Sequence, residues 1–115
     1  MPGISIHVVD VSRGLVATGM RVELWQLAPR KMVASGAISA RGLLEDAALD
    51  TNLPSATYEG LFYVGEFYRS AGVSLPALPF LEVVPYRFGL SDPAQHYHLP
   101  FKLTAWGLSC FRGGA

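Results

Sequence analysis

Hydrophobic and polar residues alternate along two stretches near opposite ends of the chain, residues 4–11 and 95–105. Successive side chains of a β-strand point to opposite sides, so alternation of this kind predicts two half-buried strands. The residues expected on the core-facing side are Ile4, Ile6, Val8, Tyr97, Leu99, Phe101 and Leu103. His7 and His98 fall on the other side of their strands. Two imidazoles brought together on the outer surface of a sheet would suit acid–base chemistry.

The remaining segments are short and separated by turn residues. Strands are expected at residues 20–27, 31–39, 57–64, 81–90 and 108–112, and one helix at residues 65–72. Residues 43–49 fit either a short strand or a helical turn. Pro85 removes a backbone donor, which favours an edge strand or a bulge, and Gly72 suits the left-handed position that ends a helix. Seven or eight short strands with one short helix predict an all-β, two-sheet sandwich.

Composition narrows the functional classes. The 115 residues predict a single domain, residues 1–115. Nine basic and nine acidic residues give zero formal charge, so no electrostatic footprint for nucleic acid or an anionic membrane is expected. Hydrophobic residues make up 50% of the chain and charged residues 16%. This apolar surplus favours burial of part of the surface against other subunits.

Cys110 is the single cysteine, which excludes an intrachain disulfide. We expect it to be an unreactive thiol that faces the core together with Leu108. The first three residues lack the basic start and apolar run of a signal peptide. No run approaches the roughly 20 apolar residues that cross a bilayer. A cytoplasmic protein is therefore expected.

Several blocks of the chain match a known family in order along its length. They are residues 4–10 (ISIHVVD), Gly14, residues 19–24 (GMRVEL), residues 58–72, residues 80–84 (FLEVV) and residues 96–113 (HYHLPFKLTAWGLSCFRG). In these blocks the chain resembles the transthyretin-like family, specifically the 5-hydroxyisourate hydrolases of purine degradation. The C-terminal block is the most specific of them.

The resemblance implies a fold, an assembly and a chemistry. The fold would be a transthyretin-type sandwich, and the assembly a homotetramer built as a dimer of dimers, whose facing sheets enclose a channel with the active sites. The substrate would be a small purine-derived heterocycle from urate degradation. The catalytic histidines of the family fall on His7 and His98, which would activate water to open a C–N bond. No metal and no organic cofactor would be needed.

The chain departs from the family at three positions. The family's catalytic arginine aligns with Leu43, and Arg41 lies two residues earlier. Phe111 stands where the family has a tyrosine, and Gly114 stands where it has a serine, whereas Arg112 matches. Arg41 would therefore serve either as a shifted substrate clamp or as a plain turn residue.

Other residues are candidates for substrate contact. Lys102 shares a face with His98 at about 13 Å along the strand, and would either replace the lost cation or be solvated. Arg112 would bind substrate or anchor the last strand, and Phe111 would close the site. The acidic residues Glu45, Asp46 and Asp50 match no metal-ligand spacing and fit a solvated loop.

Two other functional classes stay open at this point. A divergent paralogue would act on another small cyclic amide, lactone or imine. A non-catalytic relative would bind a small aromatic ligand in an apolar channel. Fold resemblance alone does not separate these from the hydrolase.

Overall fold

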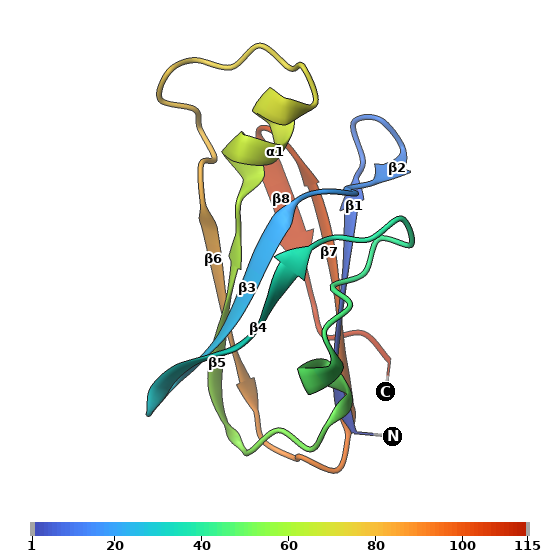
Figure 1. The fold of residues 1–115 in the computed structure, drawn as a ribbon, viewed down its shortest axis with the longest axis vertical. Helices are drawn as coiled ribbons and strands as arrows, with labels where there is room; N and C mark the ends of the chain where they lie inside the picture. Colours follow the sequence, from blue (N-terminus) through green and yellow to red (C-terminus); the bar gives the residue numbers. More distant parts are fainter. Residues whose placement is uncertain (1, 115) are drawn as a thin grey trace.

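A computed structural model describes residues 2–114. Within this range the chain forms two four-stranded sheets packed face to face, with one short α-helix and one 3₁₀ helix (Figure 1). The elements are β1 (Gly3–Asp10), β2 (Leu15–Val16), β3 (Arg21–Leu27), β4 (Arg30–Ala37), η1 (Ala47–Asp50), β5 (Ala56–Phe62), α1 (Val64–Ser70), β6 (Val84–Leu90), β7 (His96–Thr104) and β8 (Gly107–Cys110). The expected sandwich with one short α-helix is confirmed.

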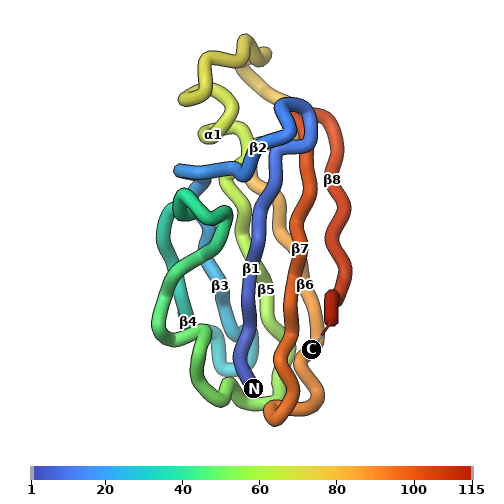
Figure 2. Tube along the Cα trace, turned by 90° about the vertical axis from the view of Figure 1, so that its right-hand side faces the viewer, coloured from blue at the N-terminus to red at the C-terminus, as the bar shows by residue number. Residues whose placement is uncertain are grey.

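The first sheet has the strand order β2-β1-β7-β8 and is called the β1 sheet below. Its two central strands come from opposite ends of the chain and run parallel, as the view onto this sheet shows (Figure 2). The second sheet, the β3 sheet, has the order β4-β3-β5-β6, and its pairs are antiparallel. The parallel β1–β7 pair is what brings the two histidine-bearing strands side by side.

The alternating residues of β1 and β7 form one side of the core. Each predicted core residue of these strands is at most 4% exposed. The facing side of the core includes buried residues of β3 and β5. Phe101 of β7 stacks on Phe62 of β5 with ring centroids 3.8 Å apart and an interplanar angle of 3°. Burial of these apolar faces holds the two sheets together, and the opposite faces of the strands stay free for polar side chains.

The helix forms where the sequence predicts it, directly after β5. Phe67 and Tyr68 are buried, so one face of α1 packs on the sandwich. Gly72 follows the helix with φ of +84°, a conformation that residues with a Cβ rarely adopt. Among the described residues no helix is long and apolar enough to cross a membrane.

A buried carboxylate connects the end of β1 to this helix. Asp10 is fully buried and accepts hydrogen bonds from the hydroxyls of Ser12 and Tyr68 and from Nε of Arg13. Burial by itself raises the pKa of Asp10, but these hydrogen bonds and the charge of Arg13 outweigh it and hold the pKa below the usual range. The network is fully paired and structural.

One expected strand start is wrong, and one pair of expected core residues is less buried than expected. The strand expected at residues 81–90 begins only at Val84, because Glu82 turns toward the helix: its carbonyl accepts from the Gly65 amide at 3.0 Å, and its carboxylate pairs with Arg69 at 2.7 Å. Leu108 and Cys110 do share the core side of β8, as expected, because they pair with Leu103 and Phe101, but at this sheet edge Leu108 stays 38% exposed and Cys110 only partly buried. Pro85 does lie on an edge strand, as expected, because β6 ends the β3 sheet.

Candidate functional site

The two histidines singled out in the sequence lie next to each other on the outer face of the β1 sheet, the face turned away from the core. His7 comes from β1 and His98 from β7, and both are half-buried. Their ring centroids are 6.5 Å apart with an interplanar angle of 28°. At this separation the two rings are too far apart for a direct hydrogen bond, and both face the same side of the sheet.

The register of the parallel pair adds a serine and a third histidine to this cluster. Ser5 lies opposite His98, and its Oγ is 2.6 Å from Nδ1 of His98 and 2.8 Å from Nε2 of His96. Nδ1 of His96 lies 3.4 Å from the carbonyl oxygen of Pro2. Neither Ser5 nor the contact of His96 was predicted. The sequence signals only that Ser5 shares a face with His7, because alternation does not fix the register between strands.

The surroundings of His98 keep its ring neutral. Burial lowers the pKa of His98, and repulsion by His7 and then by His96 lowers it further, below the ordinary value of 6.5. A neutral imidazole has a free lone pair at pH 7. It can therefore accept a proton from water without first losing one of its own.

Two glycines bring backbone close to the two rings. Gly42 has φ of +81°, and a Cβ there would lie 2.8 Å from Nε2 of His7. A Cβ on Gly113 would lie 2.9 Å from Cδ2 of His98, and the Gly113 amide donates to the His98 carbonyl at 2.6 Å. Any side chain at either position would displace a ring. These glycines therefore shape the site, a role the sequence pattern did not indicate for Gly42.

Leu43 occupies the outer face beside His7. It forms an antiparallel bridge with His7, flanked by hydrogen bonds between the Val8 amide and the Gly42 carbonyl at 2.9 Å and between the Leu44 amide and the Ile6 carbonyl at 3.1 Å. Directly paired residues present their side chains on the same face. Residues 43–49, for which the sequence allowed either a short strand or a helical turn, contain both: a β-bridge at Leu43 and then the start of η1.

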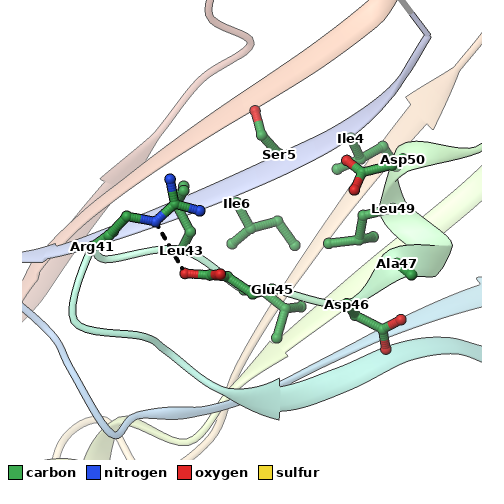
Figure 3. A pocket seen from close by; sticks show the side chains of 11 residues that line it. Ile4, Ser5, Ile6, Arg41, Leu43, Glu45, Asp46, Ala47, Leu49 and Asp50 are labelled. Atoms are coloured by element: carbon green, nitrogen blue, oxygen red, sulfur yellow. Dashed lines mark hydrogen bonds and ion pairs between the residues drawn. The ribbon is translucent and has the colours of Figure 1, made fainter.

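A pocket of about 340 Å³ lies between β1 and the segment that carries Leu43 (Figure 3). Its polar lining residues are Ser5, Arg41, Glu45, Asp46 and Asp50. Arg41 donates from Nε to Glu45 at 3.2 Å, the contact drawn as a dashed line in Figure 3, and its side chain is 71% exposed. Ser5 and Leu43 border both the pocket and the histidines, so the pocket adjoins the cluster.

Lys102 and Phe111 lie together farther along the outer face. Nζ of Lys102 is 5.8 Å from the ring centroid of Phe111, within the range of a cation–π contact. Both side chains are exposed, Phe111 by 51%. Lys102 pairs across the sheet with Val9, not with His7. The two residues therefore form a contact of their own beside the histidine cluster.

Arg112 points toward the β6–β7 connection. Its guanidinium stacks on the Tyr97 ring at 3.9 Å and donates to Oε1 of Gln95 at 2.8 Å and to the His96 carbonyl at 3.5 Å. These contacts hold the end of the chain against β7. Of the two roles expected for Arg112, these contacts fit that of anchoring the last strand. A substrate contact for Arg112 stays a prediction.

Two of the three acidic residues near η1 have protein partners. The carboxylate of Asp46 accepts from the amides of Ser35 and Ala48, and Glu45 pairs with Arg41. Within residues 2–114 no group of three or more His, Cys, Asp or Glu side chains is arranged to hold a metal ion.

Comparison with known sequences identifies close relatives. The sequence model of the HIUase/Transthyretin family matches residues 4–113. A protein named 5-hydroxyisourate hydrolase 2 from Rhizobium meliloti (strain 1021) is 35% identical over 113 residues, which is 96% of this chain and 94% of that protein. A 5-hydroxyisourate hydrolase from Deinococcus radiodurans is 34% identical, over 97% and 96% of the two chains.

Solved structures share the fold over nearly the whole chain. A 5-hydroxyisourate hydrolase from Klebsiella pneumoniae superposes with a TM-score of 0.79 and 25% identity, covering 97% of this chain and 99% of the other. An (S)-allantoin synthase gives a TM-score of 0.89 and 33% identity, but the match spans only 43% of that longer chain. Sea bream transthyretin in complex with thyroxine, at 19% identity and a TM-score of 0.83, is similar in fold alone and covers 98% of this chain.

Proposed function

Because the chain belongs to the HIUase/Transthyretin family, as the resemblance in its sequence indicated, we propose that it is a hydrolase of the 5-hydroxyisourate hydrolase type. It opens a C–N bond of a small purine-derived heterocycle in urate degradation. The observation that supports this most directly is the pair His7 and His98, with rings 6.5 Å apart on the outer face and the pKa of His98 lowered.

In the proposed reaction His98 takes a proton from a water molecule held between the two rings. The oxygen of that water forms a bond to the ring carbonyl carbon of the substrate, and the C–N bond then breaks as the departing nitrogen receives a proton from His7. For 5-hydroxyisourate the product is 2-oxo-4-hydroxy-4-carboxy-5-ureidoimidazoline. General acid–base catalysis of this kind contributes about 10²–10⁴-fold in rate.

We further propose that the protein works as a homotetramer. The outer face of the β1 sheet and its edge carry exposed apolar side chains, among them Leu15, Leu108 and Phe111. A second subunit facing this surface would cover them and enclose the histidines in a channel. Exclusion of bulk water there would strengthen the electrostatic contacts to the substrate.

The purified protein is expected to accelerate the decay of the ultraviolet absorbance of freshly generated 5-hydroxyisourate. His7→Asn is expected to lower that rate by about 100-fold or more, because the proton donor to the departing nitrogen is removed. Stopped-flow absorbance with and without protein measures both rates. Decay at the spontaneous rate in the presence of folded wild-type protein would exclude this substrate.

One observation favours the second candidate, a paralogue that acts on another small cyclic substrate. The position beside His7, where the family carries a cation, holds the apolar side chain of Leu43. Loss of one charged contact to a developing oxyanion costs on the order of 100-fold or more in rate. A substrate whose transition state develops less negative charge near Leu43 would need no cation at that position. For 5-hydroxyisourate as the substrate, Arg41 or Lys102 would have to replace the lost charge.

Leu43→Arg separates these candidates. If 5-hydroxyisourate is the substrate, the new guanidinium beside His7 is expected to raise kcat/KM by about 10-fold or more. Leu78→Arg is the matched control, because Leu78 is 87% exposed in the loop before β6, and it should leave kcat/KM unchanged. Lack of any gain in Leu43→Arg, with both proteins folded and wild-type protein active on 5-hydroxyisourate, would indicate that Arg41 or Lys102 replaces the lost charge; lack of gain with inactive wild-type protein would favour the paralogue.

A further inference from the structure

Behind His98 an unbroken chain of polar contacts runs to the backbone. It passes from the carbonyl oxygen of Pro2 to His96, from His96 to Ser5, and from Ser5 to Nδ1 of His98, with heavy-atom distances of 3.4, 2.8 and 2.6 Å. The parallel register produces it, because Ser5 lies opposite His98 while His96 lies two residues before His98 on the same face. Nε2 of His98 is the one ring nitrogen of that residue left for the site.

The donor and acceptor of each hydrogen bond in this chain follow from the backbone carbonyl of Pro2, which can only accept. A backbone carbonyl oxygen only accepts, so Nδ1 of His96 must donate to Pro2. A neutral His96 then has its lone pair on Nε2 and accepts the hydroxyl proton of Ser5. The Ser5 oxygen in turn accepts from Nδ1–H of His98. This leaves the lone pair of neutral His98 on Nε2, the form that a general base requires.

We propose that Ser5 and His96 form a proton relay behind His98, which sets the tautomer of His98 and receives the proton that His98 removes from water. The proposal rests on the function proposed above and deepens it. Ser5 is a positioning residue in this scheme, because it acts on the reacting water through its hydrogen bond to His98.

The relay balances as two proton shifts. When Nε2 of His98 binds a proton from water, the ring carries one positive charge. The Nδ1 proton of His98 then moves to the Ser5 oxygen while the Ser5 hydroxyl proton moves to Nε2 of His96. The charge now resides on His96, and His98 is neutral with its proton on Nε2. In this second state the nitrogen that faces the site donates a hydrogen bond, and His7 remains the group that protonates the departing nitrogen.

The relay also explains why two histidines separated by one residue occur on this face. Without Ser5, like charges on His96 and His98 would only repel each other. With Ser5 between them, one hydroxyl that both donates and accepts lets the two rings share a single proton. His7 lies outside the relay, since its ring centroid is 6.5 Å from that of His98, too far for a direct hydrogen bond between the rings.

The test combines Ser5→Ala with a spectroscopic readout. Long-range ¹H–¹⁵N NMR of wild-type protein at neutral pH should show His98 protonated on Nδ1 and His96 protonated on Nδ1. In Ser5→Ala the His98 signals should lose the Nδ1–H pattern, and kcat should fall by about 10-fold or more with KM within about 2-fold. Ser5→Thr keeps the hydroxyl on a strand position and should restore both readouts. Ser55→Ala, the same change at an exposed loop position, is the matched control.

The outcomes separate the relay from the proposed function. His98 protonated on Nε2 in neutral wild-type protein overturns the relay, even if Ser5→Ala fails to fold. Unchanged kcat and unchanged His98 signals in folded Ser5→Ala overturn it as well. If wild-type protein does not hydrolyse 5-hydroxyisourate, the proposed function fails, and the NMR spectra still decide whether Ser5 sets the tautomer of His98.

Discussion

His98→Asn is expected to lower the rate of 5-hydroxyisourate hydrolysis by about 10²–10⁴-fold, the range that a general base contributes. Asparagine places an amide nitrogen near the position of Nδ1, so the hydrogen bond to Ser5 can persist. The nitrogen that faces the site, Nε2, has no counterpart in asparagine. The variant therefore removes the base with little change to the strand pairing. Stopped-flow absorbance gives the rate, and a loss of less than about 10-fold would remove His98 from the mechanism.

The pH dependence of the wild-type protein provides a second measure of the same group. Burial, followed by the charges of His7 and His96, lowers the pKa of His98 below 6.5. The base must be neutral to accept a proton, so kcat/KM should hold from pH 7 to about 6.5 and decline only as the pH falls through this lowered pKa. An acid limb centred at pH 7 or above would contradict the assignment.

Phe101→Ala is expected to lower the free energy of unfolding by about 3–5 kcal/mol, the usual cost of emptying a buried aromatic site. Phe101 is fully buried, stacks on Phe62 from the opposite sheet and meets the Tyr86 ring edge-on at 6.3 Å. The alanine variant leaves a void between the sheets that neighbours fill only in part. Urea unfolding followed by circular dichroism measures the change.

A matched substitution on the surface tests whether burial is the cause. Phe80 is 69% exposed and touches the Trp106 ring at the molecular surface. Phe80→Ala should therefore change the free energy of unfolding by about 1 kcal/mol or less. Equal losses in the two variants would contradict the assignment of Phe101 to the centre of the core.

Local patterns predicted the parts of this protein that depend on neighbouring residues in the chain. The alternation in residues 4–11 identified the core face of β1 because each strand side chain is set by its own backbone. Pro85 indicated an edge strand because it lacks a donor, and Gly72 marked the helix end through its conformation. Recognition of the family extended these local predictions to the whole sandwich.

The sequence-based expectations that the structure changes, at residues 81–83 and at Leu108, depend on contacts between segments that are distant in the chain. Residues 81–83 look like a strand, but the amide of Gly65 and the charge of Arg69 draw Glu82 toward the helix. Leu108 alternates like a core residue, yet it lies on the edge strand β8 and stays partly exposed. No pattern within either segment contains this information.

The sequence by itself determined that His7 and His98 point away from the core, because strand alternation settles the face of each side chain. Only the tertiary structure decided that they become neighbours, since the parallel pairing of β1 and β7 joins chain segments some ninety residues apart. The same register sets Ser5 opposite His98, and the bridge from β1 sets Leu43 beside His7. The physical reason is that hydrogen-bond register between strands depends on the packing of the whole sandwich, which local side-chain preference does not encode.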